Sequence, residues 1–248
     1  MRNRKKKWTS KELDTNPLVV HEPVSLKGQW CSHFGNSNPI RLEIGCGKGQ
    51  FISQAAEKHP EINFVALERD ATILGMAARK GNAVTGDKHL AYIVEDVENL
   101  PNLFAPGEIE ALYIQFCDPW PGKKNRAKRR LTHARFLESY KSLGIGALYF
   151  KTDNRELFDF SIGQFESTGW VLENVSYDLH GSGTPANEIM TEYETKFSSL
   201  GQPIYRLEAY LGACDRRDPF GVKAEPGDRN EPLGVKAEPG DREEPLGD

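Results

Sequence analysis

The chain has few cysteines and no long apolar run. Its four cysteines, Cys31, Cys46, Cys117 and Cys214, are far apart, and no two of them form a C-x-x-C pair. This spacing argues against a disulfide framework and against a cysteine-bound zinc, and it fits a reducing compartment. No stretch approaches the ~18 consecutive apolar residues of a membrane span, and the basic N-terminus is not followed by the apolar region of a signal peptide. We therefore expect a cytoplasmic protein that uses no metal and contacts no membrane.

Most of the chain also lacks an excess of one charge. The net charge of the 248 residues is −4, but residues 215–248 carry ten acids against six bases. The 36 acids and 32 bases of the whole chain therefore leave 26 of each for the first 214 residues. A neutral body with locally basic segments is compatible with a nucleic-acid partner. With 38% hydrophobic and 10% aromatic residues, the chain can fill one sizeable core.

The two ends of the chain are poor in apolar residues. The sequence PFGVKAEPGDRNE at 219–231 recurs as PLGVKAEPGDREE at 232–244, and each 13-residue copy offers only one or two large apolar side chains between prolines and glycines. We therefore predict a disordered acidic tail over residues 215–248. At the other end, residues 1–11 hold six bases and only Trp8 as an apolar anchor. This composition predicts a flexible basic arm over residues 1–16, either solvated or in contact with a phosphate backbone.

The intervening residues 17–214 show the apolar periodicity of a single α/β domain. Helical patterns separate five predicted strands, which lie at 40–44, 62–67, 91–94, 112–116 and 147–150. Asn154 can cap the helix that follows the fifth of them. Two further predicted strands, at 170–179 and 204–211, lack the long helix that a parallel crossover needs. We expect a mostly parallel sheet with an antiparallel edge and helices on both faces.

A glycine-rich loop follows the first predicted strand. Gly45, Gly47 and Gly49 form G-x-G-x-G at the start of a helix, where a ligand can approach the backbone closely. A dinucleotide fingerprint requires G-x-G-x-x-G, and this spacing therefore favours a nucleoside cofactor other than NAD. Glu68 ends the second strand and can accept hydrogen bonds from ribose hydroxyls, and Asp96 follows the third strand, within reach of an adenine amine. The alternative for Glu68 is an ordinary exposed strand-end acid.

The segment 112–130, LYIQFCDPWPGKKNRAKRR, passes from an apolar strand through one acid into positive charge. Asp118 follows the strand, where open α/β sheets bind their ligands, and the prolines on both sides of Trp120 prevent further regular structure. The loop beyond contains six bases and no acid: Lys123, Lys124, Arg126, Lys128, Arg129 and Arg130. A solvated loop is the simple interpretation, but this setting favours a loop that binds a polyanion.

These motifs resemble those of the bacterial single-chain tRNA (guanine-N7-)-methyltransferases, over roughly residues 40–210. The resemblance rests on LEIGCGKGQF at 42–51, DPWP and K-K-x-x-x-K-R-R-L at 118–131, FKTDN at 150–154, and TEYETKF at 191–197. It implies a Rossmann-like class I methyltransferase fold, S-adenosyl-L-methionine as the cofactor, and tRNA as the partner, with guanosine 46 of the variable loop as the target. The oligomeric state, monomer or homodimer, is left open.

The resemblance also assigns roles to residues. The implied catalytic residue is Asp118. The cofactor-binding residues, which include two glycines of the loop, are Glu43, Gly45, Gly47, Glu68, Asp96 and Asp118. The implied substrate-binding residues are Lys123, Asp153, Thr191, Glu192, Tyr193 and Glu194. The family runs from DPWP directly into its lysine pair, whereas Gly122 intervenes here, so Lys123 is the match and Lys124 the alternative.

The chemistry of the implied reaction bears on Asp118. Guanine N7 carries an in-plane lone pair at neutral pH and loses no proton when it is methylated, so no strong base is required. We therefore expect Asp118 and Asp153 to orient the guanine and favour its developing charge, with a base role for Asp118 as the alternative. For the segment 191–194, the alternative to RNA contact is that Tyr193 and Phe197 are simply the buried side of a short helix. Rival functions are a methyltransferase of another substrate and a non-catalytic RNA-binding module.

Overall fold

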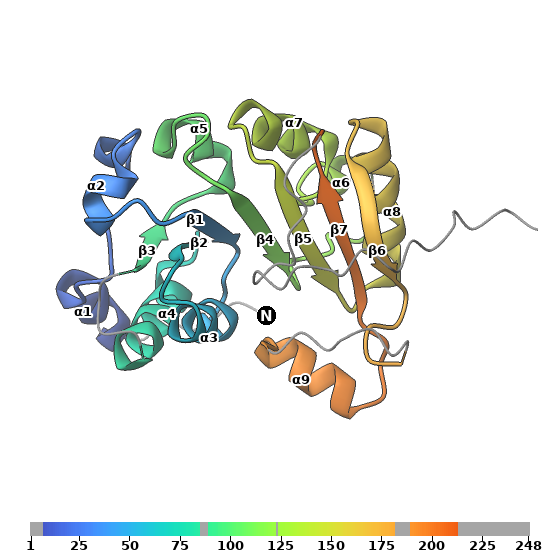
Figure 1. Cartoon of the computed structure of the whole chain (residues 1–248). Coiled ribbons are helices and arrows are strands. Elements are labelled where there is room, and N and C mark those ends of the chain that lie inside the picture. Colours follow the sequence, from blue (N-terminus) through green and yellow to red (C-terminus); the bar gives the residue numbers. More distant parts are fainter. Residues whose placement is uncertain (1–6, 85–88, 123, 182–188, 213–248) are drawn as a thin grey trace, which may run out of the picture. The chain divides into compact units, whose positions relative to one another are not determined.

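The computed structural model describes residues 7–84, 89–122, 124–181 and 189–212. The chain divides into residues 1–216 and residues 217–248, and the second unit, with most of the predicted disordered tail, lies outside the described residues. The first unit contains one seven-stranded sheet with the order β3-β2-β1-β4-β5-β7-β6 (Figure 1). The strands are β1 (Ile40–Ile44), β2 (Asn63–Glu68), β3 (Leu90–Val94), β4 (Ala111–Gln115), β5 (Ala147–Thr152), β6 (Val171–Ser176) and β7 (Tyr205–Tyr210).

The strand pairing is that of an open α/β sheet with one antiparallel edge. β1 pairs in parallel with β2 and β4, β2 with β3, and β4 with β5. β7 is antiparallel to both β5 and β6. The order β3-β2-β1-β4-β5, in which the chain winds first one way from β1 and then the other from β4, creates a switch point between β1 and β4. The predicted fold class is confirmed.

Helices cover both faces of the sheet. α3 (Gln50–Lys58) and α4 (Ala71–Val84) contact β2, whereas α8 (Arg155–Ser167) contacts β5, β6 and β7. α7 (Ala134–Ser142) packs beside α8. The shorter elements are α2 (Trp30–Phe34), α5 (Leu100–Leu103), α6 (Lys124–Ala127) and two 3₁₀ turns, η1 (Pro23–Leu26) and η2 (Val97–Asn99). The predicted cap of α8 is confirmed, because Oδ1 of Asn154 accepts a hydrogen bond from the amide of Leu157 at 2.8 Å.

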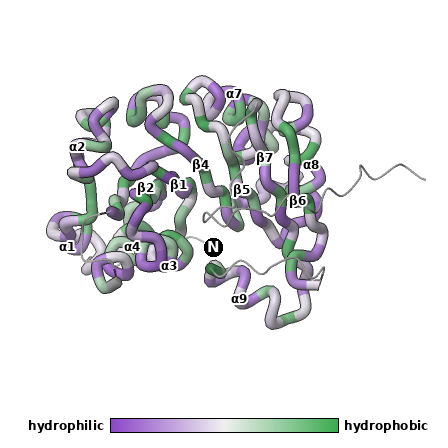
Figure 2. The backbone as a smooth tube through the Cα atoms, viewed as in Figure 1, coloured by the Kyte–Doolittle hydropathy of each residue, from purple (hydrophilic) through white to green (hydrophobic). Residues whose placement is uncertain are grey.

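Two of the strands, β1 and β7, are buried along their whole length although they carry charge. β1 has the sequence IRLEI and β7 the sequence YRLEAY, and every residue of both strands is buried. Figure 2 shows the result as a backbone that changes between hydrophobic and hydrophilic colours along the strands. The apolar side chains of one face join a core that includes Trp30, Phe104 and Tyr140. The charged side chains of the other face need polar partners, as in the 2.9 Å ion pair between Arg41 and Glu110.

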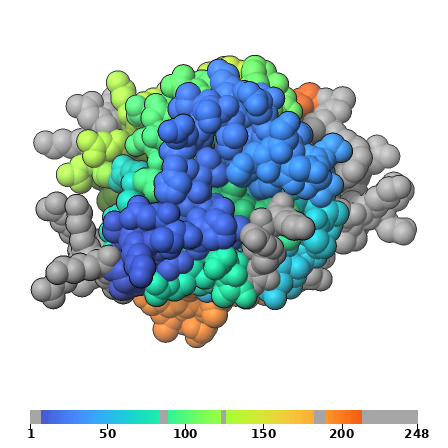
Figure 3. Space-filling view, turned by 90° about the vertical axis from the view of Figure 1, so that its left-hand side faces the viewer, coloured from blue at the N-terminus to red at the C-terminus, as the bar shows by residue number. Residues whose placement is uncertain are grey.

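One prediction about the N-terminus is wrong. Residues 7–15 of the predicted flexible arm form α1 (Lys7–Thr15), which packs against α4, and Figure 3 shows the blue N-terminal residues spread over this side of the molecule. Thr9 is 3% exposed, and a Cβ added to Gly75 would lie 2.9 Å from it. Arg79 stacks 3.8 Å from the ring of Trp8 and pairs with Glu12. The partners that order α1 lie on α4, far along the chain. Residues 1–6 are outside the described residues.

Candidate active site

Five predicted site acids lie at the carboxyl ends of the parallel strands. Glu43 belongs to β1 and Glu68 ends β2, while Asp96, Asp118 and Asp153 follow β3, β4 and β5. Because parallel strands point the same way, these ends share one edge of the sheet, and α9 (Glu192–Ser199) lies beside the ends of β4 and β5 (Figure 1). The acids of β1 to β3 thus stand on one side of the switch point and those of β4 and β5 on the other.

The glycine loop joins β1 to α3 and uses its glycines for two purposes. Gly47 and Gly49 have left-handed φ values of 56° and 72°. A Cβ added to Gly49 would lie 2.7 Å from Cβ of Ala77, so this glycine allows α3 and α4 to approach each other. A Cβ added to Gly47 would meet no described atom within 4 Å. The loop therefore keeps open space beside Gly47, where a ligand can lie against the backbone.

Glu43 is a buried acid at this loop. It is 2% exposed and accepts a hydrogen bond from the amide of Ile52, but its Oε2 has no hydrogen-bond partner among the described residues. Burial raises the pKa of the Glu43 carboxyl well above its usual value, and the nearby Glu68 carboxylate raises it further. A buried acceptor without a partner is uncommon in folded proteins and indicates that something else completes the site.

Glu68 and Asp96 are held by backbone amides. The Glu68 carboxylate accepts hydrogen bonds from the amides of Asp70 at 2.9 Å and Gly47 at 3.3 Å, and burial raises its pKa. The exposed Asp96 accepts a hydrogen bond from the amide of Glu98 at 3.0 Å and so caps η2. Both acids are fixed in place at the strand ends, as hydroxyl and amine ligands require.

These residues fit S-adenosylmethionine. Its nucleoside part carries ribose hydroxyls and an adenine amine, and its amino acid part carries a cationic amine. The acceptor carboxylates of Glu68 and Asp96 suit the nucleoside part, and the open backbone at Gly47 and the unused oxygen of Glu43 suit the amino acid part.

The loop after β4 contains two residues in a conformation that side chains rarely adopt. Phe116 has a φ of 51° and Trp120 a φ of 43°, on either side of the exposed Asp118. β4 ends at Gln115, one residue before the predicted end at Phe116. The amide of Phe116 donates to the carbonyl of Lys151 on β5 at 2.9 Å. Left-handed non-glycine residues cost about 1–3 kcal/mol each and cluster at functional sites. The conformation of this loop is thus fixed by its neighbours rather than by its own preference.

The basic run is not uniformly available to a ligand. Lys123 lies outside the described residues, as does the side chain of Lys124, so the choice between these lysines stays open. Arg130, predicted as one of the phosphate-binding bases, has a side chain only 5% exposed. It donates to the carbonyl of Pro119 at 2.8 Å and pairs with Glu156 at 2.6 Å. The prediction is therefore wrong for Arg130, which is a structural support of the Asp118 loop.

An exposed cationic pair remains beside Trp120. The guanidinium of Arg129 lies 4.9 Å from the Trp120 ring, and that of Arg69 lies 5.8 Å from it. Both arginines are exposed. Sequence reasoning did not identify Arg69, although it directly follows Glu68 at the end of β2. The fold brings it to the rim where the basic run begins, so bases from both sides of the switch point meet at this tryptophan.

The first turn of α9 contains the four predicted substrate residues. Thr191 caps the helix through a 2.9 Å hydrogen bond from the amide of Glu194, and Glu192 pairs with Lys48 at 3.3 Å and Lys80 at 2.7 Å. Tyr193 is 58% exposed and Glu194 is 0% exposed. The alternative in which Tyr193 lies on the buried side of this helix is therefore wrong, because the buried residue is the acid.

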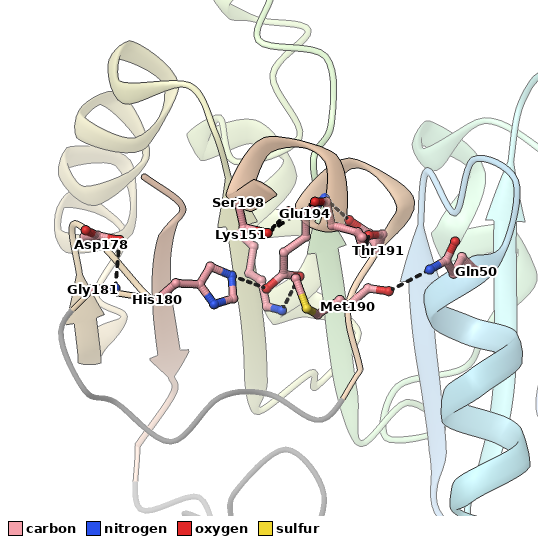
Figure 4. A network of polar contacts seen from close by, with 10 residues as sticks. Gln50, Lys151, Asp178, His180, Gly181, Met190, Thr191, Glu194 and Ser198 are labelled. Atoms are coloured by element: carbon pink, nitrogen blue, oxygen red, sulfur yellow. Dashed lines mark hydrogen bonds and ion pairs between the residues drawn. The ribbon is translucent and has the colours of Figure 1, made fainter. Parts of the chain in front are cut away.

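Glu194 is enclosed by a polar network that the sequence did not reveal (Figure 4). Nζ of Lys151, whose side chain is 4% exposed, lies 2.7 Å from Oε2 of Glu194. Nε2 of His180 lies 3.3 Å from Oε1 of Glu194, within the distance of an ion pair. The same Oε1 accepts no hydrogen bond from the described residues. Burial lowers the pKa of the Lys151 ammonium, and the Glu194 carboxylate opposes this effect. The motif FKTDN contains Lys151, but only the fold shows that its side chain points to α9.

Two thiols near the site are unsuited to act as nucleophiles. Burial raises the pKa of Cys46 well above its usual value, and the acids Glu43 and Glu68 raise it further. Burial and the adjacent Asp118 raise the pKa of Cys117 to about 12. Within the described ranges, no three His, Cys, Asp or Glu side chains are grouped so that they could hold a metal ion. No helix in these same ranges is long and apolar enough to cross a bilayer.

Comparison with known proteins identifies relatives over most of the chain. The sequence model of a family described as "Putative methyltransferase" matches residues 37–207. A protein from Lachnoclostridium phytofermentans named tRNA (guanine-N(7)-)-methyltransferase is 46% identical over 197 residues, which cover 79% of this chain and 91% of that protein. One of the same name from Bacillus subtilis is 44% identical over 211 residues, covering 84% of this chain and 98% of that protein.

A solved structure supports the fold. The 16S rRNA methyltransferase KamB superposes with a TM-score of 0.55 at 14% identity, covering 74% of this chain and 93% of that one, so the likeness concerns the fold alone. The fold and the site define an enzyme of the class I methyltransferases, whose cofactor is S-adenosylmethionine. Within that class, the chain belongs to the tRNA (guanine-N7-)-methyltransferase family.

Proposed function

We propose that this protein methylates N7 of a guanosine in tRNA, with guanosine 46 of the variable loop as the target. The observation that carries the proposal is the arrangement of acids across the switch point. Beside the glycine loop, Glu43 of β1 is buried and Glu68 of β2 is half-buried, whereas Asp118 and Asp153 are exposed at the ends of β4 and β5. One side suits a nucleoside cofactor, and the other suits a polar base that arrives from solvent.

When bound, S-adenosylmethionine supplies a methyl group on a positively charged sulfur. Glu43, Gly47, Glu68 and Asp96 are the residues that would hold it. Asp118 stands next to the switch point and would border both this group and the guanine. The proposed cofactor roles of these residues rest on their hydrogen-bond acceptors and on the open space at Gly47.

On the substrate side, Asp118 and Asp153 would accept hydrogen bonds from N1–H and the amino group of the guanine. Such contacts leave the N7 lone pair free to attack the methyl carbon, and the carboxylates favour the positive charge that the ring gains. No residue has to remove a proton from N7. The task of Asp118 is therefore orientation and electrostatic stabilisation, which agrees with its exposed position beside two left-handed residues.

The rim of the site suits an RNA backbone. Arg129 and Arg69 are exposed beside Trp120, and Lys128 is exposed on the same loop. Bases on such a rim neutralise phosphates and release counterions, which makes binding sensitive to salt. Because the substrate would be tRNA, we also propose that the enzyme works in the cytoplasm.

The test is incubation with S-adenosylmethionine that carries a labelled methyl group and with unmodified tRNA, followed by nucleoside analysis. We expect labelled 7-methylguanosine in tRNA and none in free guanosine. A tRNA in which guanosine 46 is replaced by adenosine is the matched control and is expected to stay unlabelled. Label at another guanosine would overturn the position, label in a different substrate would overturn the tRNA assignment, and cofactor binding without any transfer would indicate an RNA-binding module.

A further inference from the structure

A closed circuit of contacts links α9 to the two strand ends that carry Asp118 and Asp153. The ring of Tyr193 stacks on that of Phe116 with centroids 6.3 Å apart. The amide of Phe116 donates to the carbonyl of Lys151, and Nζ of the same lysine donates to the carboxylate of Glu194, the residue after Tyr193. Lys151 therefore holds both partners of the stacked pair, one through its backbone and one through its side chain.

Lys151 is close in sequence to Asp153, and it is hydrogen-bonded to Phe116, which is close in sequence to Asp118. Lys151 lies two residues before Asp153, and its partner Phe116 lies two residues before Asp118. Lys151 is also opposite Gln115 in the register of β4 and β5. A displacement of the Lys151 side chain would therefore displace the loops that carry Asp118 and Asp153, because both loops begin at these two paired strand ends.

The four residues at the start of α9 differ in what they offer to a substrate. Thr191 caps the helix, Glu192 is shared between Lys48 and Lys80, and Glu194 is fully buried against Lys151. The amide of the Gln50 side chain also donates to the carbonyl of Met190, just before this turn, at 3.3 Å (Figure 4). Tyr193, with more than half of its surface exposed, is the most exposed of the four.

We propose that Lys151 is a positioning residue, which uses its buried ion pair with Glu194 to hold the first turn of α9, and with it Tyr193, over the guanine side of the site. Glu194 then acts inside the protein and does not contact RNA. The inference rests on the proposed methylation of tRNA and deepens it. It replaces the role that family resemblance implies for Glu194 and adds a residue, Lys151, that the resemblance does not assign.

The physical argument is the cost of a buried ion pair. Two charges taken out of water are stabilised only in a tight geometry, whereas apolar residues of similar volume often serve stability equally well. Lys151→Met leaves the buried Glu194 with only the partly exposed His180 nearby, and Glu194→Gln leaves the buried Lys151 without its carboxylate, whereas the double variant leaves neither charge. The pair therefore fixes where α9 sits, and a variant that removes both charges separates this role from a direct contact with RNA.

The experiment compares Lys151→Met, Glu194→Gln and the double variant with the wild-type full-length protein. Glu138→Gln with Lys141→Met is the matched control, since this ion pair on α7 is far more exposed than the Lys151–Glu194 pair and lies on another helix. Hydrogen exchange of the α9 amides needs neither tRNA nor cofactor. KM and kcat for tRNA and the Kd for S-adenosylmethionine complete the set.

We expect each single variant to accelerate exchange in α9 by about 100-fold, with little change in β4 and β5. Its kcat/KM for tRNA should fall by a similar factor, mainly through KM, while the Kd for S-adenosylmethionine stays within about threefold. The double variant should recover both exchange and kcat/KM to within about tenfold of wild type, since no charge is left unpaired. The control should match wild type.

Three results would overturn the inference. If Lys151→Met is normal while Glu194→Gln and the double variant lose tRNA affinity equally, Glu194 contacts RNA. If exchange accelerates throughout the sheet and the Kd for the cofactor rises in parallel, the pair only stabilises the fold. If α9 exchange is unchanged in both single variants, the pair does not hold the helix. Failure of the wild type to methylate tRNA would instead overturn the proposed function, and the exchange data would still judge the position of α9.

Discussion

The two sides of the carboxyl edge are built by different kinds of contact. On the β1 to β3 side, the acids are held mainly by amides close to them in the chain, as Glu68 is by Asp70 and Asp96 is by Glu98. The amide of Gly47 is a second, more distant partner of Glu68. On the β4 and β5 side, the supports come from distant segments. Lys151 and Glu194 are 43 positions apart, yet their ion pair is 2.7 Å long. The cofactor side is therefore held mainly by amides nearby in the chain, whereas the substrate side depends mainly on partners from distant segments.

This difference predicts how each side of the site responds to changes elsewhere in the molecule. Contacts between near neighbours in the chain form together with their strand and helix, so we expect the cofactor side to tolerate distant changes better than the substrate side. The substrate side depends on α9, on two left-handed residues and on Arg130, each of which is held by another element. Segments supported in this way open more easily than core strands. We expect changes on the substrate side to affect activity first and changes on the cofactor side to affect folding or cofactor affinity.

The largest expected effect is on the substrate side, at Asp118. Asp118→Asn keeps the shape of the side chain but removes the charge that favours the developing positive guanine, so kcat should fall by about 10²–10³-fold. Because the proposed role is orientation, the factor should be nearly constant between about pH 6 and 9. The measurement is kcat with tRNA across this range, with Asp159→Asn on the exposed surface of α8 as the control.

The opposite outcome for Asp118 is clear. A base role would require a proton to move in the chemical step, whereas an orienting carboxylate moves none. A clear solvent isotope effect on kcat in the wild type that Asp118→Asn lacks would replace the orienting role with general base catalysis.

The next effect contrasts two glycines on the cofactor side. Gly49→Ala combines a left-handed φ with a Cβ only 2.7 Å from Ala77, and should lower the free energy of unfolding by about 2–4 kcal/mol. Gly47→Ala has the strained φ without the clash and should cost about 1 kcal/mol. Its Cβ would enter the space next to the loop, so the affinity for S-adenosylmethionine should fall instead. Chemical denaturation and calorimetric titration measure the two quantities.

These two variants can contradict the interpretation of the loop. Equal stability losses would mean that the contact with Ala77 does not set the requirement at Gly49. An unchanged cofactor affinity in Gly47→Ala would mean that the open space at Gly47 is not part of the binding site.

The sequence predicted the features that depend on near neighbours in the chain, and it did not predict those that depend on distant partners. Period and turn signals identified β1 to β7, the cap at Asn154 and the acids at the strand ends, because each depends on neighbours in the chain. Three errors share one cause. α1 is ordered by Gly75 and Arg79 of α4, Arg130 turns inward to Pro119, and the buried residue of α9 is an acid because Lys151 meets it. No local pattern encodes these partners.

Variants of the adjacent residues Arg129 and Arg130 test whether one arginine of the basic loop binds tRNA while the other stabilises the fold. Arg130→Met removes a buried donor to the Pro119 carbonyl and should cost about 2–3 kcal/mol of stability. Arg129→Met lies on the exposed side over Trp120 and should change stability by less than about 0.5 kcal/mol. It should instead reduce the slope of log affinity for tRNA against log salt by about 1. Denaturation and binding at several salt concentrations separate the two, and equal effects of both variants on the slope would contradict this division.

The smallest expected effect is on the cofactor side, at Glu43. Its pKa is raised in the folded protein, so the native state keeps the proton to a higher pH than the unfolded chain does. The contribution of this group to stability is therefore complete below the ordinary glutamate pKa and is lost as pH rises through the raised value. Glu43→Gln is neutral at every pH, so it should stabilise the cofactor-free protein at neutral pH by about 1 kcal/mol, a rise in Tm of about 2–4 °C, and have little effect near pH 4. Its affinity for S-adenosylmethionine should fall at the same time, because the carboxylate that would meet the cationic amine is gone. Thermal unfolding at the two pH values measures the change in stability, and calorimetric titration measures the change in cofactor affinity. If Glu43→Gln is less stable than the wild type at neutral pH, Glu43 supports the fold and is not a binding group that destabilises the cofactor-free protein.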